Sequence, residues 1–180
     1  MKRAPPPAKG GTQAILRHWQ EAVPNDRLAH LVRDAAKGLM RALHMRLLDH
    51  GVSFGHWTFL RILWEQDGLT QRELSEQAGV MEPTTFSALK AMEILGYIRR
   101  NQNKTNKKKV FIHLTPKGRA LKAKLVPLAL DVNRIAIRGA SASDVAIARK
   151  TMLKMIENLA RDEDAVLSSP ARQRPSRRLS

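Results

Sequence analysis

Hydrophobic residues in the first third of the chain recur at the three- and four-residue steps of amphipathic helices. The longest pattern begins after Asp26, a good helix-capping residue, and ends near Gly51. Its apolar members are Leu28, Leu31, Val32, Ala35, Leu39, Leu43 and Leu47. Ser53 can cap a second, strongly apolar helix that Gly68 ends. A short helix over residues 15–22 is expected ahead of both.

The middle of the chain predicts two short helices joined by a tight turn. Thr70 and Glu73 have the spacing of a capping box, so a helix is expected to start at Thr70 and stop at Gly79. Pro83 suits the first turn of the next helix, which Gly96 ends. The apolar side of that helix is expected to hold Phe86, Leu89 and Met92 or Ile94. Two short helices separated by a tight turn in this way are typical of a helix-turn-helix unit.

Two short apolar runs, 97–99 and 110–114, enclose a polar loop and predict a β-hairpin, or wing, after the helix-turn-helix. A long helix follows, in which Pro127 predicts a kink. Ser141 or Ser143 can cap a last helix. The expected fold class is mostly α with a small β-hairpin wing. It is a winged helix-turn-helix domain plus N- and C-terminal helices, whose surplus apolar surface predicts a dimer.

These elements divide the chain into three expected segments. The central one should contain a winged helix-turn-helix and two sets of dimerisation helices. The segments are a basic, Pro-rich extension with a short helix at 1–24, the main domain at 25–165 (winged helix-turn-helix 53–115, dimerisation helices 26–50 and 116–165), and a disordered basic tail at 166–180.

Charge points to the class of partner. The chain has 32 Lys and Arg against 16 Asp and Glu, a formal net charge of +16, which favours nucleic acid first and an anionic membrane second. No apolar run of about 18 residues predicts a membrane span, and the N-terminus lacks the apolar core of a secretory signal. We expect a cytoplasmic protein that binds no membrane.

Candidate chemistry is limited by the residue types present. The chain has no cysteine, which excludes disulfides, thiolate catalysis and sensing by cysteine oxidation. The six histidines show no dense metal-binding spacing, so neither a metal nor a cofactor is expected. Paired catalytic carboxylates, a supported nucleophile motif and a phosphate-cradling glycine loop are all missing from the sequence pattern, and we expect no enzyme.

Positive charge is concentrated around the expected wing. Residues 94–130 include ten Lys and Arg and no acid. A solvated loop is the plain interpretation of a lysine run, but its position directly after a helix-turn-helix favours contact with phosphates. We expect the wing and the start of the following helix to form one continuous positive surface whose binding to DNA weakens steeply with salt.

The sequence resembles the MarR family of winged helix-turn-helix transcription regulators over residues 27–159. The resemblance is strongest from 69 to 118, in LTQRELSEQAGV, TTFSALKAMEILGYIRR and VFIHLTPKG. It implies a homodimer on a pseudo-palindromic operator in double-stranded DNA, and a repressor released by a small aromatic acid or its acyl thioester, such as a CoA ester. The implied dimer uses the first and the last two helices, with candidates Leu28, Leu31, Val132, Ile135, Val145, Met152 and Leu159. The alternative for many of these residues is that they face their own core.

The expected wing departs from the family pattern at one element. Where the family usually carries Asp-x-Arg before the second strand, this chain has Asn106, Lys107 and Lys108. A flexible ammonium therefore replaces a planar guanidinium fork, and the bracing acid is missing. We expect this wing to hold phosphates more than it reads bases.

Base reading is expected from the helix at 82–95, whose first turn should present Glu82, Thr84 and Thr85 outward. The alternative is that the two threonines are ordinary first-turn hydroxyls. The candidate DNA-binding residues are Gln71, Arg72, Glu82, Thr84, Thr85, Ser87, Lys90, Arg99, Arg100, Lys104, Lys107, Lys108 and Lys109.

An effector site is a further expectation. An arginine or histidine can hold a carboxylate while indoles stack on an aromatic ring. The two helices that would line the family's effector cleft carry the candidates His44, His56, Trp57, Arg61 and Trp64. For the two tryptophans, seven residues apart on one helix, plain core packing is the favoured alternative.

Two functions from different classes fit these observations. The first is a dimeric, sequence-specific transcription regulator, expected to be a repressor. The second is an architectural protein that binds DNA largely without sequence choice. Binding to random DNA at equal salt separates them, because an architectural protein should bind it nearly as well as its own promoter.

Overall fold

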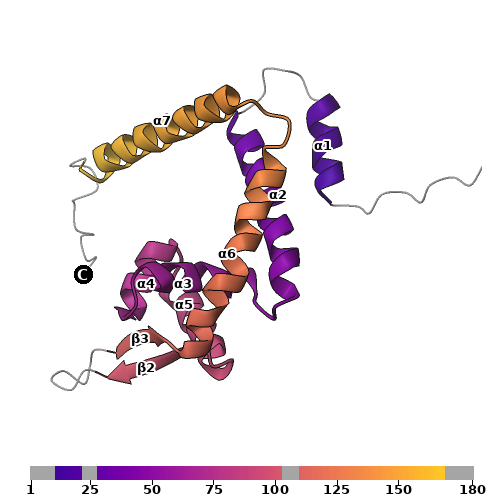
Figure 1. The fold of residues 1–180 in the computed structure, drawn as a ribbon. Helices are drawn as coiled ribbons and strands as arrows, with labels where there is room; N and C mark the ends of the chain where they lie inside the picture. Colours follow the sequence, from indigo (N-terminus) through magenta and orange to yellow (C-terminus); the bar gives the residue numbers. More distant parts are fainter. Residues whose placement is uncertain (1–10, 22–27, 103–109, 169–180) are drawn as a thin grey trace, which may run out of the picture. The chain divides into compact units, whose positions relative to one another are not determined.

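The computed structural model describes residues 11–21, 28–102 and 110–168, which form two compact units split between Ala136 and Ile137. Figure 1 shows the elements along the chain. They are α1 (Thr12–Glu21), α2 (Leu28–Leu48), α3 (Phe54–Glu65), β1 (Leu69–Thr70), α4 (Gln71–Ala78), α5 (Glu82–Ile94), β2 (Ile98–Gln102), β3 (Val110–Leu114), α6 (Pro116–Ala136) and α7 (Ala142–Leu167). None of the described helices is long and apolar enough to cross a membrane.

Helix ends follow the capping chemistry expected from the sequence. The Ser53 hydroxyl accepts a hydrogen bond from the His56 backbone N–H at 3.1 Å, and Thr70 with Glu73 forms a complete capping box at the start of α4. Gly79 ends α4 in the left-handed region, with φ +64°, where glycine adopts the backbone without strain. Ser141, not Ser143, caps α7 in a second capping box.

The sheet has three antiparallel strands in the order β1-β3-β2. The predicted hairpin is confirmed, with β2 and β3 paired from Ile98↔Leu114 to Gln102↔Val110. Its first strand is longer than the predicted 97–99. β1 was missed by the sequence analysis because a two-residue strand is too short to show alternation; it pairs Leu69 with Ile112.

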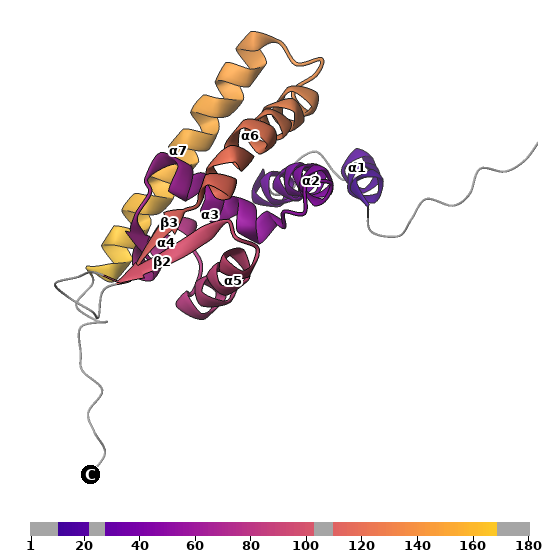
Figure 2. The same ribbon diagram turned by 60° about the horizontal axis from the view of Figure 1, so that its bottom comes forward.

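The core of the first unit lies between α2, α3, α6 and the inner face of the helix-turn-helix (Figure 2). Its largest buried side chains come from every one of these elements, which fixes α4 and α5 to a common support. They include Leu47, Leu60, Leu63, Leu74, Leu89, Met92, Ile112 and Leu125. The prediction of a winged helix-turn-helix held on flanking helices is confirmed.

The predicted apolar side of α5 is partly wrong. Phe86 is 47 % exposed and Ile94 78 % exposed, while Thr85 is fully buried beside Leu89 and Met92. Positions 85, 89 and 92 follow the i, i+4, i+7 repeat of one helix face, and Phe86 is rotated by about 100° from Thr85. The hydrophobicity of phenylalanine outweighed this spacing in the prediction.

The start of α6 is docked against the turn between α5 and β2. The Thr115 hydroxyl donates to the Gly96 carbonyl at 2.6 Å and accepts from the Gly118 N–H at 3.1 Å. A Cβ on Gly118 would lie 2.0 Å from the Tyr97 carbonyl oxygen, so only glycine allows this approach. The two motifs ILGY and LTPKG therefore form one joint, which sets α6 against the C-terminal end of α5. α6 continues past Pro127 to Ala136 as a single helix, and the kink expected there stays a prediction.

α1 lies against α2 in the opposite direction. The Trp19 indole N–H donates to Asp34 at 3.3 Å, and the Thr12 methyl lies beside Gly38, one turn further along α2. The short helix expected near the N-terminus is thereby confirmed, although it spans 12–21 rather than 15–22.

We expect strong acid to break the contact between Trp19 and Asp34. The hydrogen bond from Arg33, reinforced by those from Lys37 and Trp19, lowers the pKa of Asp34 from 3.8 to about 2. Because the folded pKa is below the unfolded one, this carboxylate stabilises the fold above pH 3.8, and its contribution is lost as the pH falls through about 2. In NMR titrations the chemical shift of the Trp19 indole N–H should change with a midpoint near pH 2, the pKa of Asp34. A midpoint at 3.8 or above, or the same curve in Asp34→Asn, would contradict the assignment.

Candidate nucleic-acid interface

A buried hydrogen bond joins the two helices of the helix-turn-helix. The hydroxyls of Ser75 on α4 and Thr85 on α5 lie 2.8 Å apart, and both side chains are buried. The Ser75 hydroxyl is also within reach of the Gln71 carbonyl at 3.0 Å. The expectation that Thr85 faces outward is therefore wrong, because its hydroxyl is used to hold α5 against α4.

The outer side of α5 carries a row of exposed side chains. Figure 2 shows this side of the helix uncovered by other elements of its unit. Sequence reasoning missed Phe86 and Met81 here; the spacing of Thr85, Leu89 and Met92 was the signal that could have placed Phe86 outside. The exposed residues are Met81, Glu82, Pro83, Thr84, Phe86, Ser87 and Lys90. Hydroxyls, an ammonium and apolar groups that can contact a thymine methyl are therefore combined on one helix.

Arg72, near the start of α4, is paired within its own helix. Its Nε lies 2.9 Å from Glu76 Oε1. The hydrogen bond to Glu76, with the nearby charges of Glu76 and Glu82, raises the pKa of Arg72 above its usual value. An open groove between the two helices is lined by Arg72, Ser75, Glu76, Gly79, Val80, Met81 and Glu82. Because Glu76 and Glu82 lie next to Arg72, this end of the interface is less positive than Arg72 alone suggests. Gln71, the residue before Arg72, is half-buried.

Three of the six described cations in the stretch 94–130 are paired with acids, and the continuous positive surface expected there stays a prediction. The pairs are Glu93 with Arg100, Asp67 with Arg119 and Glu65 with Lys122, and in the last two the acid is distant in sequence.

Lys117 also has a structural partner, because its ammonium donates to the Leu95 carbonyl at the end of α5. Arg99 and Lys124 remain as the cations of this stretch with no ion pair or hydrogen bond inside the described residues. Lys104, Asn106, Lys107, Lys108 and Lys109 lie outside the described residues.

Arg99 and Arg100 are neighbours with different surroundings. Arg99 is exposed. Arg100 lies with Nε 3.1 Å from Glu93 Oε2, and its guanidinium sits 5.4 Å from the centre of the Phe86 ring. Both partners belong to α5, so Arg100 links β2 of the wing to the helix expected to read bases.

The candidate effector residues fall into two groups. Trp57 is buried, its ring meets that of Trp64 edge to face at 5.6 Å, and the Trp64 indole N–H donates to the Gly118 carbonyl at 3.0 Å. The two indoles are therefore packed within the protein, as the favoured alternative held. Arg61 is exposed, with its guanidinium 6.0 Å from the Trp57 ring.

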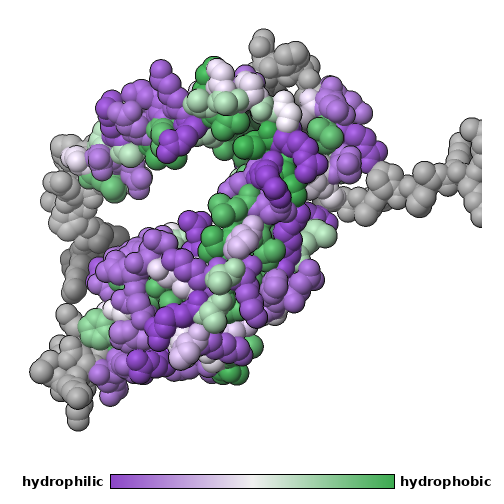
Figure 3. Space-filling view, in the orientation of Figure 1, coloured by the Kyte–Doolittle hydropathy of each residue, from purple (hydrophilic) through white to green (hydrophobic). Residues whose placement is uncertain are grey.

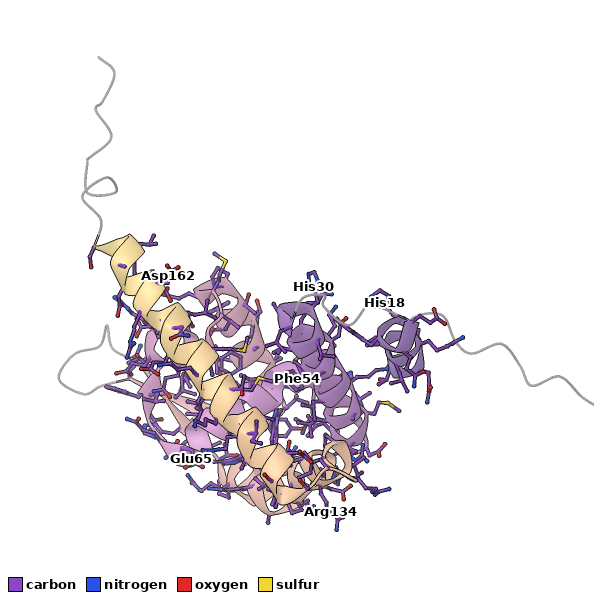
Figure 4. All side chains as sticks on the ribbon, turned by 90° about the horizontal axis from the view of Figure 1, so that it is seen from above. His18, His30, Phe54, Glu65, Arg134 and Asp162 are labelled. Atoms are coloured by element: carbon purple, nitrogen blue, oxygen red, sulfur yellow. The ribbon has the colours of Figure 1, made fainter. Side chains whose placement is uncertain are left out.

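His44 and His56 form the second group. Each has a buried Nδ1 without a hydrogen-bond partner among the residues the structure describes. Burial lowers the pKa of His56, which favours its neutral form. Phe54 and Glu65 mark the two ends of α3, the helix that carries His56 (Figure 4).

Within 11–21, 28–102 and 110–168, no three His, Asp or Glu side chains gather as metal ligands would. Figure 4 shows His18 on α1 and His30 near the start of α2, on separate helices.

Apolar side chains outside the core mark a further surface. Figure 3 shows them along α6 and the adjoining part of α2. Of the predicted dimer residues, Val132 is wrong as a surface candidate, since it is 5 % exposed within the core of its own unit. Val145 is half-buried. The remaining candidates are exposed: Leu28, Leu31, Ile135, Met152 and Leu159.

The family model that matches the chain is that of the MarR family, over residues 52–110. A curated relative is the HTH-type transcriptional regulator TtmR of Methylorubrum extorquens, 32 % identical over 101 residues. That match covers 56 % of this chain and 52 % of the relative, so the chain spans about half the relative's length.

Solved structures share the fold. A MarR-family transcriptional regulator from Listeria monocytogenes, complexed with 26mer DNA, aligns with a TM-score of 0.68 at 23 % identity, covering 80 % of this chain and 96 % of that one. Bordetella bronchiseptica BpsR, whose DNA binding is regulated by 6-hydroxynicotinic acid, aligns with a TM-score of 0.66 at 18 % identity, covering 72 % and 98 %. Both likenesses concern the fold alone.

Proposed function

This chain belongs to the MarR family of winged helix-turn-helix transcription regulators, and from that premise we propose that it binds one operator as a homodimer and represses transcription. The observation that carries the proposal is the outer side of α5, where Thr84, Ser87 and Lys90 are exposed on a helix locked to α4. Two such helices related by a two-fold axis fit successive major grooves, about 34–36 Å apart. The operator should then be an imperfect palindrome.

The pairing of cations favours sequence-specific over architectural binding. Nonspecific affinity grows with the number of free cations that can replace counterions on phosphates. In the described stretch from 94 to 130, Arg100, Arg119 and Lys122 already have acidic partners. A protein built for binding without sequence choice would gain from leaving them free. Base contacts from α5 are thus the better account of how DNA is selected.

The proposal of a homodimer is based on apolar side chains that other residues of their own unit do not cover. Leu28 and Leu31 on α2 are exposed, as are Met152, Ile156 and Leu159 on α7. Exposed apolar residues repeated along two long helices are typical of an association surface. A second copy of the chain is the proposed partner, as the resemblance to the MarR family implies.

A small aromatic acid or its acyl thioester is the proposed effector. The buried, unsatisfied Nδ1 atoms of His44 and His56 can receive a polar group of a ligand, and Arg61 is exposed five residues after His56 on α3. The fold neighbour BpsR responds to 6-hydroxynicotinic acid. Footprints on the promoter beside the chain's own gene, repeated with aromatic acids and their CoA esters, test this. Protection that persists with every compound would reject an effector of this class.

Removing the base-reading side chains tests the operator claim. We expect Thr84→Ala with Lys90→Ala to lower the preference for the operator over random DNA by about 30-fold or more, since each of the two base contacts contributes about 1–3 kcal/mol. The matched control is Lys150→Ala on α7, which removes an exposed lysine that belongs to the second unit and not to the winged helix-turn-helix. Equal preference in the double variant and the wild type would contradict base reading by these residues.

A further inference from the structure

Arg99 and Arg100 lie side by side on β2 but on opposite faces of the strand, because successive side chains alternate. Arg100 shares its face with Ile98, which is buried in the core, and pairs in register with Ile112 of β3. Its side chain is 27 % exposed. Arg99 stands on the other face and is exposed. The chain therefore places one arginine toward α5 and the other toward solvent.

We propose that Arg100 is a positioning residue that fixes the wing strand against α5, and so determines operator specificity without contacting DNA itself. The proposal rests on sequence-specific DNA binding by α5, as inferred above. The proposal gives the two adjacent arginines different roles. Arg100 braces α5, which means that it holds the wing strand against this helix, and Arg99 contacts a phosphate.

The contacts of Arg100 are suited to fixing the orientation of α5 about its own axis. Glu93 and Phe86 are seven residues apart on α5, so they lie on one helix face about two turns, or 10 Å, apart. The Nε atom of Arg100 lies 3.1 Å from Glu93 Oε2, and its Cζ lies over the Phe86 ring, 5.4 Å from the ring centre. A planar guanidinium offers several N–H donors and a flat face for these two partners at once, whereas an ammonium is a point charge on a flexible stem and holds them less firmly.

The same contacts remove Arg100 from the charge available to DNA. Its Nε and Nη2 atoms are shielded from solvent, and Nε contacts Glu93 as an ion pair without hydrogen-bond geometry. Two of the three guanidinium nitrogens are therefore not exposed to a phosphate. The pair with Glu93 has no net charge, and neutral pairs release no counterions when DNA binds. The loss of Arg100 should therefore change which sequence is bound more than how strongly DNA in general is bound.

A rotation of α5 would move every side chain on its outer side together. Thr84, Ser87 and Lys90 are spread over two turns of the same helix. Hydrogen bonds to base edges weaken steeply once distance and angle leave a narrow range. A brace across both turns thus acts on all of these contacts, which is how a residue away from the DNA can determine specificity.

The test compares four variants of the full-length dimer: Arg100→Gln, Arg100→Lys, Glu93→Gln and Arg99→Gln. Each is titrated with its own promoter fragment and with random DNA of equal length, at several salt concentrations. Thermal unfolding confirms that the variants remain folded. For Arg100→Gln and Arg100→Lys we expect the preference for the promoter to fall about tenfold or more, with random-DNA affinity within about threefold and the salt slope unchanged.

Arg99→Gln and Glu93→Gln separate the brace from simple electrostatics. Arg99→Gln should weaken binding to both DNAs alike and reduce the salt slope by about one, with the preference unchanged. Glu93→Gln adds positive net charge, yet it should lower the preference as the Arg100 variants do. If Arg100 were a phosphate contact, Glu93→Gln would free it and strengthen binding to both DNAs, while Arg100→Lys would resemble the wild type.

Two results would overturn the proposal, and they differ from a failure of the proposed function. The first is Arg100→Gln behaving like Arg99→Gln. The second is an unchanged promoter preference in Glu93→Gln while the wild type prefers its promoter strongly. A wild type that binds random DNA as well as its promoter would instead reject specific binding, and the brace with it.

Discussion

Gly118→Ala is expected to lower the free energy of unfolding by about 3 kcal/mol or more, because overpacking against backbone leaves no side chain that can yield. The added Cβ would lie 2.0 Å from the Tyr97 carbonyl oxygen and 3.0 Å from its carbon. Relief requires α6 to move away from the turn between α5 and β2. That movement breaks the bonds of Thr115 to this turn and of Trp64 to the Gly118 carbonyl. Urea unfolding followed by circular dichroism measures the loss.

Gly38→Ala is the matched control for this prediction. A Cβ on Gly38 meets only the Thr12 methyl, at an ordinary 3.7 Å. In the middle of α2, alanine should stabilise the helix by about 0.5–1 kcal/mol. Gly118→Ala with a stability within the error of the wild type would show that the joint between ILGY and LTPKG is not as tight as the structure places it.

Neutralising Lys107, Lys108 and Lys109 together to glutamine is expected to give the largest loss of DNA affinity. These residues lie outside the described part of the chain, and the prediction rests on their place between β2 and β3. If each holds one phosphate, the slope of log K against log salt should become shallower by about 2.7, and affinity should fall roughly 100-fold near 0.15 M salt. Promoter and random DNA should lose equally, since phosphates carry no sequence information.

Lys122→Gln provides the control for the wing. Lys122 is a cation of the same basic stretch, but it lies near Glu65 and the Trp64 carbonyl at the end of α3. Its removal should leave the salt slope almost unchanged. A triple wing variant with wild-type affinity and slope would remove the wing from the DNA-binding surface.

Much of the local structure could be predicted because the signals are local. Ser53, Thr70 and Ser141 are caps that act within one helical turn, and all three cap as expected. The wing strand 110–114 was predicted with its observed bounds. Such features depend on residues three or four positions apart, which sequence spacing shows directly.

The errors concern side chains whose partners are distant in sequence. Thr85 is buried because Ser75, ten residues earlier, completes its hydrogen bonding. The pairing of Arg119 with Asp67 joins residues 52 positions apart. Charge counted along a stretch of sequence cannot show such neutralisation. The same limit applies to the partners of Arg100, Glu93 and Phe86, which the sequence did not show; its assignment as a DNA contact stays a prediction.

Competition binding of the wild-type protein tests most directly whether α5 selects one DNA sequence. The labelled promoter fragment is bound at fixed salt and displaced by unlabelled promoter or random DNA of equal length. If α5 selects one sequence, random DNA should compete at least about 1,000-fold less well than unlabelled promoter, as is usual for specific regulators. Random DNA that competes within a few-fold of the promoter would contradict it.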